Sequence, residues 1–286
     1  MDFKRIAWIF FFAFLGVNVF LYNIYHEAGS EQTVVYRSDQ KIPIEKRLDS
    51  ENISYDHKFS NEEVEGYYLS GQPTDMKKTI DEARDQKNDP NFLKTQSTIK
   101  DSKLLHTMKN KPLLTDTKET KKTMTKFLEE NDELILGNDY HYMGKWSVWS
   151  EDYPRIFAAQ MYEGIPIHDD SSMLSITLNR EGDHYQLISY TQTHVSELMP
   201  LREAMSLYTE KDAINTLYVN NKIPANATIK WQQLAYTLTL KVRGKNVYVP
   251  AWFVAIETED GVHVEQVNAL TNRIVTNSTV QTVENS

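Results

Sequence analysis

The chain has 286 residues, with 31 lysines and arginines against 40 aspartates and glutamates, which gives a formal net charge of -9. A content of 40% hydrophobic and 25% charged residues is typical of one large or two small folded domains and not of a disordered chain. The absence of cysteine excludes disulfides, thiolate catalysis and cysteine-bound zinc or iron–sulfur clusters, and the acidic balance argues against nucleic acid as a partner.

An uncharged apolar segment covers residues 6–25, directly after Lys4 and Arg5. About 20 such residues match the length of a helix that crosses a membrane, and the positive charges favour a cytoplasmic N-terminus. The sequence therefore predicts a cytoplasmic tail (1–5), a single transmembrane helix (6–25) in the cell membrane, and an extracellular remainder. A cleaved signal peptide fits less well, because the apolar run is long and no small-residue cleavage site directly follows it. A buried soluble helix is the remaining alternative.

Asn18 lies within this predicted span, where lipid offers its amide no hydrogen-bond partner. Helical spacing places it on one face with Phe11, Leu15, Tyr22 and Tyr25. We predict that this face contacts a partner's transmembrane helix. The alternative is that the Asn18 amide bonds to its own helix backbone and lies near the outer interface.

The region that follows, residues 26–114, is polar and has weak periodicity. We interpret it as a membrane-proximal extracytoplasmic region. Short alternations predict strands at 32–37 and 41–48, and apolar spacing predicts a helix at 76–85.

From residue 115 the pattern becomes regular. Candidate N-caps at 115–117 precede a predicted helix that ends near residue 130. Strands are predicted at 140–149, 155–162, 172–179 and 185–192, a second helix from residue 200 to about 217, and strands at 229–240, 246–258, 261–269 and 273–275. The fold class is therefore α+β, with two tandem helix-plus-antiparallel-sheet units, 115–199 and 200–286.

The two ends of the chain carry a family resemblance. The residues responsible are Asp2, Lys4, Arg5, Ile9, Phe10, Phe14, Leu15 and Asn18 at the start, and Pro250, Ala251, Trp252, Asn268, Ala269 and Ile274 at the end. With these residues the chain resembles the YycI (WalI) family of membrane-anchored accessory proteins of Gram-positive bacteria, over nearly its whole length. The repeated unit, with its Asn-Ala-x-Thr turn at 268–271, also resembles the extracytoplasmic PepSY modules.

The YycI resemblance implies a non-enzymatic regulator of the essential WalK (YycG) sensor histidine kinase. It implies action together with a sister protein, YycH, through transmembrane and extracytoplasmic contacts, in the control of cell-wall homeostasis. The predicted cytoplasmic tail of five residues is too short to signal by itself, so we expect an inward signal to pass through a partner in the membrane.

No motif indicates catalysis, and we expect no catalytic, cofactor-binding or metal-binding residue. The sequence has no G-x-S-x-G elbow, Walker loop, G-x-G-x-x-G or H-E-x-x-H. The nearest metal-like cluster, at 168–170, is more simply interpreted as a solvated turn. The alternative function is a membrane-anchored binding module for a cell-wall glycan or a secreted peptidase, because four tryptophans could line a groove: Trp146, Trp149, Trp231 and Trp252. Core packing is the simpler interpretation of these side chains.

Overall fold

The computed structural model describes residues 8, 11, 14, 15, 17, 18, 42–114, 119–149, 154–182, 184–275 and 281–283, the last three by their backbone alone. The chain divides into two compact units, Met1–Asn52 and Ile53–Ser286. Its class is α+β and mostly sheet, as predicted.

In the first unit, six residues of the predicted membrane span are described, and all six are helical and exposed: Trp8, Phe11, Phe14, Leu15, Val17 and Asn18. The rest of residues 6–25, the predicted tail at 1–5 and the predicted strand at 32–37 lie outside the described residues. Across the described parts of the chain, no helix is both long and apolar enough to span a membrane.

The prediction of a strand at 41–48 is wrong, because residues 44–50 form helix α2 (Ile44–Ser50). Pro43 occupies the N-cap position with a φ of -51°, which suits the start of a helix. Ile44 and Leu48 are buried and four residues apart, so they share one helix face. Residues four apart fit both a helix face and every second position of a strand, so the few apolar residues of this segment did not distinguish the two.

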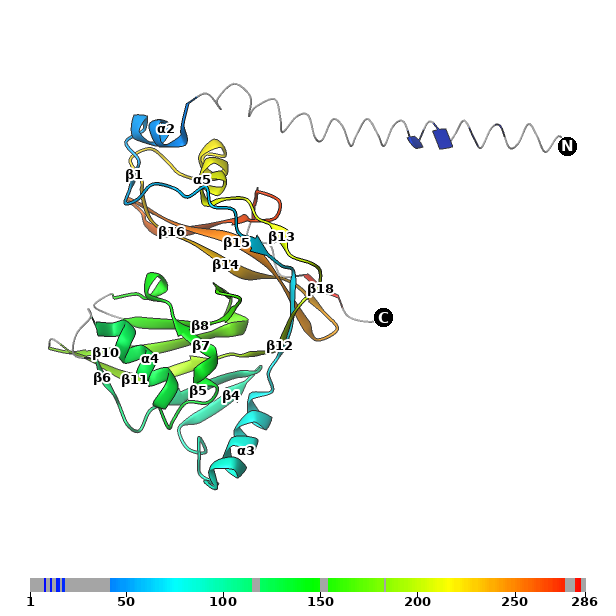
Figure 1. Ribbon diagram of the computed structural model, residues 1–286. Coiled ribbons are helices and arrows are strands. Elements are labelled where there is room, and N and C mark those ends of the chain that lie inside the picture. The colour runs from blue at the N-terminus through cyan, green and yellow to red at the C-terminus, as the bar shows by residue number, and fades with distance from the viewer. Residues whose placement is uncertain are drawn as a thin grey trace. The chain divides into compact units, whose positions relative to one another are not determined.

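The second unit contains two eight-stranded sheets (Figure 1). All pairs in the first sheet are antiparallel. Its main path in spatial order is β4 (Ser97–Lys100), β5 (Lys103–Thr107), β11 (His184–Gln192), β10 (Met173–Glu181), β8 (Arg155–Tyr162) and β7 (Tyr140–Tyr142), with β6 (Leu113–Leu114) beside β11 and β9 (Ile165–Pro166) beside β8.

Helices α3 (Met76–Lys87) and α4 (Thr120–Glu130) contribute to the core of the first sheet. Met124, Phe127 and Leu128 of α4 are buried in one cluster with strand residues such as Leu174 and Tyr190. The predictions of a helix at 76–85 and of a helix ending near 130 are confirmed. The predicted strand at 140–149 is shorter, because a 3-10 turn (Gly144–Trp146) follows β7.

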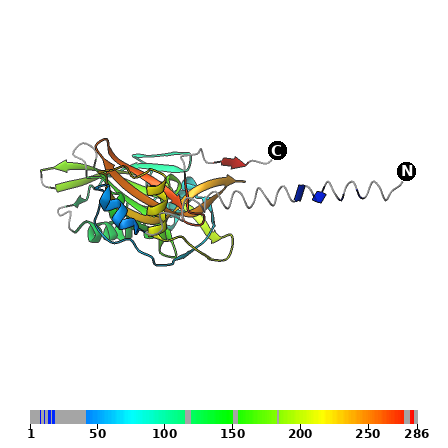
Figure 2. The same cartoon turned by 90° about the horizontal axis from the view of Figure 1, so that it is seen from above.

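The second sheet is built on a long antiparallel hairpin, β14 (Thr228–Val242) and β15 (Lys245–Thr258). Helix α5 (Glu210–Val219) lies on the face of this sheet that is turned away from the first sheet (Figures 1 and 2). The other strands are β1 (Ser54–Tyr55), β3 (Leu69–Pro73), β12 (Val195–Pro200), β16 (Gly261–Asn268), β17 (Arg273–Ile274) and β18 (Gln281–Val283).

The second helix was predicted to begin at residue 200, and this start is wrong. Residues up to Pro200 still pair with β3, and β13 (Met205–Ser206) pairs with β2 (Glu65–Gly66). The helix begins after Thr209, whose side chain accepts a hydrogen bond from the Asp212 backbone while Asp212 bonds back to the Thr209 backbone. This capping box satisfies two free N–H groups and determines the start of α5.

Strands from before residue 115 take part in both sheets. β4, β5 and β6 extend the first sheet, whereas β1 and β3 extend the second. The polar region 26–114 therefore contributes to the same two layers as the regular part of the chain. The division into tandem units at 115 and 200, and their PepSY-like character, stay predictions.

Candidate functional site at the junction of the two sheets

Two strands carry the chain between the sheets, and they pair with each other. β11 leaves the first sheet at Gln192, and after two residues β12 begins in the second sheet. β12 pairs antiparallel with β3, in the register Val195↔Pro73 to Pro200↔Leu69. The connection between the sheets is therefore a two-stranded ribbon and not a single flexible linker.

Gln160 of β8 is the centre of the hydrogen-bond network where this ribbon begins. It is 5% exposed. Its Oε1 accepts from Ser172 Oγ at 2.6 Å and from the Val195 backbone N–H at 2.8 Å, and its Nε2 lies 2.9 Å from both the Val195 carbonyl oxygen and His194 Nε2. Because Val195 is the first residue of β12, one side chain of the first sheet holds the start of the ribbon.

His194 links three elements at the same point. It is 8% exposed. Its Nδ1 lies 2.7 Å from Thr74 Oγ1, directly after β3, and its Nε2 lies 2.9 Å from Asp139 Oδ2, directly before β7. The carbonyl oxygen of His194 also accepts from the Thr74 N–H at 2.9 Å. His194 thus joins the end of β3, the start of β12 and the turn before β7.

Thr193 adds hydrogen bonds to the turn before β10 and to Tyr140 of β7. Its Oγ1 donates to the Asp170 carbonyl oxygen at 2.6 Å and accepts from the Met173 N–H at 3.0 Å. The Tyr140 hydroxyl donates to the Thr193 carbonyl oxygen at 2.6 Å. Burial raises the pKa of Tyr140 well above its usual range, so this hydroxyl remains a donor at any physiological pH.

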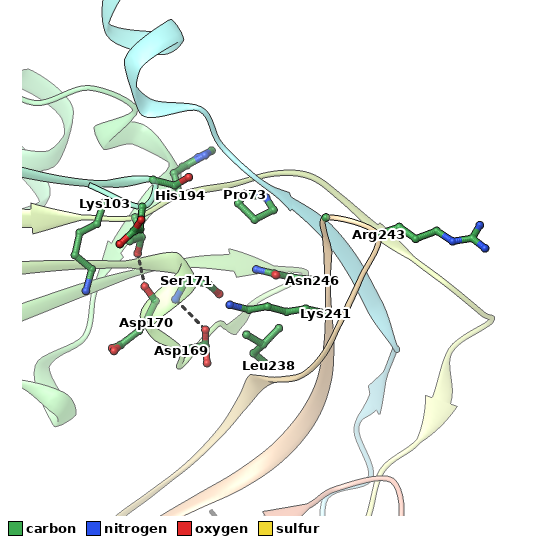
Figure 3. A pocket seen from close by; sticks show the side chains of 14 residues that line it. Pro73, Lys103, Asp169, Asp170, Ser171, His194, Leu238, Lys241, Arg243 and Asn246 are labelled. Carbon is green, nitrogen blue, oxygen red and sulfur yellow. Dashed lines mark hydrogen bonds between the residues drawn. The ribbon is translucent and has the colours of Figure 1, made fainter. Parts of the chain in front are cut away.

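A pocket of about 550 Å³ opens beside this junction (Figure 3). One wall comes from the β4–β5 turn with Lys103, another from the β14–β15 hairpin with Lys241, and a third from the turn before β10 with Asp169 and Asp170. Lys241 extends toward the Asp169–Ser171 turn, whereas Arg243 extends away from it (Figure 3). The pocket is therefore lined from both sheets and carries charges of both signs.

Asp169 is the most buried charged group of this pocket. Burial raises the pKa of its carboxyl, while hydrogen bonds from Ser171 and the nearby Lys241 ammonium act in the opposite direction. The Ser171 N–H donates to Asp169 Oδ1 at 2.8 Å. Asp169 is thus a carboxylate held in position by the backbone of its own turn.

The interpretation of residues 168–170 as a solvated turn is wrong for His168. Its imidazole lies between the rings of Trp146 and Phe253, with centroids at 4.2 and 4.4 Å, and its backbone N–H donates to the Tyr236 carbonyl oxygen at 2.8 Å. Burial lowers the pKa of His168 to about 4. In the described part of the chain, no three His, Cys, Asp or Glu side chains are grouped so that they could hold a metal ion.

We expect this partly buried imidazole to make the free energy of unfolding depend on pH. The native state keeps His168 neutral down to about pH 4, whereas the unfolded chain binds a proton near pH 6.5. The neutral imidazole therefore stabilises the folded protein fully above about pH 6.5, and this stabilisation is lost as the pH falls toward 4. The free energy of unfolding should fall by about 2 kcal/mol between pH 7 and pH 5. Urea unfolding of the full-length protein in detergent, followed by tryptophan fluorescence, measures this loss.

The matched variant is His168→Phe, which keeps an aromatic ring between Trp146 and Phe253. It should show a smaller loss of unfolding free energy than the native chain over the same pH range. Asp169, whose pKa is raised, acts in the opposite direction in both proteins, so the difference between them isolates His168. An equal loss in both proteins would contradict the assignment.

The four tryptophans that could line a groove instead pack against the hydrophobic clusters of the described residues. Trp146 and Trp231 belong to the cluster between the two sheets, together with Ala251 and Phe253. Trp149 packs against the core of the first sheet. Trp252 packs beside Leu234, and its Nε1 donates to the Tyr208 carbonyl oxygen at 2.8 Å. The structure thus favours the core interpretation over a glycan-binding groove.

The predicted transmembrane contact face is described only in part. Phe11 and Leu15 are 56% and 48% exposed, and Asn18 is also exposed. Tyr22 and Tyr25 lie outside the described residues. The role of this face stays a prediction.

Sequence reasoning missed the junction itself. Gln160 and His194 belong to no motif, and the His194 partners Thr74 and Asp139 are far away in the sequence. One signal was present, because Gln160 is a polar residue inside the apolar run of β8. Such a side chain needs buried partners, but the sequence does not say which.

Comparison with known proteins identifies the family of this chain. The family model described as "YycI protein" matches residues 31–270, which is most of the chain. The chain belongs to the YycI family. The membership confirms the YycI resemblance. It implies an accessory regulatory role in the system of the WalK (YycG) sensor kinase.

Two solved structures are distantly similar to this YycI chain. An uncharacterized protein from Eubacterium rectale is 9% identical, with a TM-score of 0.46 over 79% of this chain and 91% of that one. The C-terminal domain of Bacillus megaterium YpeB is 12% identical, with a TM-score of 0.34 over 71% and 96% of the two chains. No curated protein matches. Neither structure assigns a function to this chain.

Proposed function

We propose that this YycI-family chain is a non-enzymatic accessory regulator of a WalK-type sensor histidine kinase in a Gram-positive bacterium. It is anchored in the cell membrane by one helix over residues 6–25, with residues 1–5 in the cytoplasm and the sheets outside. It acts with a YycH-like sister protein and modulates signalling for cell-wall homeostasis. The family match over residues 31–270 is the observation that carries the proposal.

The membrane helix is the route by which an outer protein can affect a kinase inside. A regulator shifts a kinase between two states only by contacting those states differently. The proposed contact face contains Phe11, Leu15, Asn18, Tyr22 and Tyr25. Asn18 supports it, because an amide in a lipid environment gains most from a partner on another helix.

The test is recovery of the kinase with the full-length chain from crosslinked membranes. Replacing residues 6–25 by polyleucine should abolish recovery. Asn18→Leu should reduce recovery by about threefold to tenfold, the effect of losing one hydrogen bond between membrane helices. Val17→Leu is the matched control, because residue 17 is adjacent but points to another side of the helix, and it should recover the kinase normally.

Two results would contradict this assignment. If the polyleucine chain recovers the kinase as well as the native chain, the span is only a tether. If Asn18→Leu and Val17→Leu behave alike, Asn18 is not part of the contact. The amount of chain in the membrane, measured by immunoblot, separates a lost contact from lost protein.

A further inference from the structure

We propose that the pocket between the two hairpins binds a small zwitterion, either an amino acid or a short peptide with free termini. Lys103 and Lys241 would hold its carboxylate, and Asp169 and Asp170 would hold its ammonium group. This proposal stands apart from the kinase assignment, since it rests on the pocket alone.

The pocket presents charged side chains that form no salt bridge within the described part of the chain. Among the ion pairs of the described residues, none includes Lys103, Lys241, Asp169 or Asp170. Opposite charges that line one pocket without pairing are available to a ligand that carries both signs. A ligand with only one charge would leave one set of side chains unmatched.

A chain of hydrogen bonds positions Ser171, which lines the pocket beside Asp169. The buried Asn246 Nδ2 donates to the Tyr248 hydroxyl at 2.8 Å, and this hydroxyl lies 2.6 Å from Ser171 Oγ. Either hydroxyl can be the donor between Tyr248 and Ser171. Burial raises the pKa of Tyr248 to about 12, so the phenol stays protonated near neutral pH. The Ser171 side chain also hydrogen-bonds to the Asp169 carboxylate, so this chain of bonds holds the acidic wall of the pocket in position.

The size and the walls of the pocket agree with this class of ligand. Its volume is about 550 Å³, within the range of roughly 300–1,000 Å³ that is usual for small-molecule sites. Lys103 comes from the first sheet and Lys241 from the second. A bound zwitterion would therefore contact both sheets beside the ribbon that joins them.

Isothermal titration calorimetry with the purified full-length protein in detergent tests the proposal. The probes are alanine and alanyl-alanine, with N-acetyl-alanyl-alanine, alanyl-alanine amide and inorganic phosphate as comparison ligands. Near pH 7 the first two carry both charges. We expect one of them to bind, and each blocked form to bind at least tenfold more weakly. The relative affinities of alanine and alanyl-alanine show whether the ligand is an amino acid or a peptide.

Variants locate the binding. Lys241→Met and Asp169→Asn should each weaken binding of the zwitterion at least tenfold. Lys245→Met is the matched control, because Lys245 is an exposed residue of the same β14–β15 hairpin that does not line the pocket, and it should bind normally. The melting temperature of each unliganded variant shows that the fold is intact.

Several results would overturn the proposal. These are no binding of either zwitterion at millimolar concentration, equal binding of a blocked form, and equal binding of phosphate, which would indicate a simple anion site. Unchanged binding by both Lys241→Met and Asp169→Asn would place the ligand elsewhere. A loss of kinase recovery in the membrane experiment would leave this result unaffected, so the two assignments fail separately.

Discussion

Replacing Gln160 by leucine will destabilise the protein by about 3–5 kcal/mol, although the two side chains are similar in size. The substitution removes both partners of the Val195 backbone and the acceptor of Ser172 Oγ. Buried polar groups without partners each cost about 1–3 kcal/mol. Urea unfolding of the full-length chain measures the change in the free energy of unfolding. Hydrogen exchange should be faster at the Val195 amide, because its acceptor is gone.

Gln233→Leu is the control for this prediction. Gln233 is half-buried on β14, and its amide makes a single hydrogen bond, to the Leu234 carbonyl oxygen at 3.2 Å. Its replacement should cost less than about 1 kcal/mol. If Gln160→Leu costs no more than the control, Gln160 does not organise the junction.

The second large effect is expected at Gly71, in the middle of the ribbon. A Cβ at this position would lie 2.3 Å from Val195 Cγ1 and 3.0 Å from Leu198 Cδ2. Gly71 is also paired with Asn246 of β15, so its backbone has little freedom to move away. Gly71→Ala should therefore destabilise the protein by about 2–3 kcal/mol through overpacking. Thermal and urea unfolding of the full-length chain measure this cost.

A double-mutant cycle shows whether the cost arises from this contact. Val195→Ala alone should cost about 2 kcal/mol, because it removes buried methyl groups. In the double mutant the new methyl group occupies the space that Val195 left, so the combined cost should be about 1–2 kcal/mol smaller than the sum. Gly144→Ala is the control, since its nearest neighbour would be a Tyr142 ring atom at 3.3 Å. Simple additivity would show that the clash with Val195 is not the cause.

The regular elements of the outer part could be predicted because each follows from local pattern. Residues 155–162, predicted as a strand, form β8, and the apolar spacing of Met124, Phe127 and Leu128 predicted α4. Both patterns arise from side chains a few positions apart, which determine the face of an element that is buried. The predicted start of the second helix at residue 200 was wrong, because β12 pairs with β3 up to that residue.

The candidate site could not be predicted in the same way. Thr74 and His194 lie 2.7 Å apart but are 120 residues apart in sequence. The isolated histidine at 168 has the polar neighbours of a turn, yet it is enclosed by Trp146 and Phe253. Burial of such a residue depends on the packing of distant strands, and its own neighbours in the sequence carry no information about it.

By itself, the sequence determined the α+β class, most of the regular strands, the exclusion of thiol chemistry and the family to which the chain belongs. The tertiary structure alone decided which strands form each sheet, how β3 and β12 join them, and where the charged pocket opens. The physical reason is that a two-residue period specifies the buried face of a strand but not its neighbour. The neighbour is selected by long-range packing, and the junction and its pocket exist only once that selection has been made.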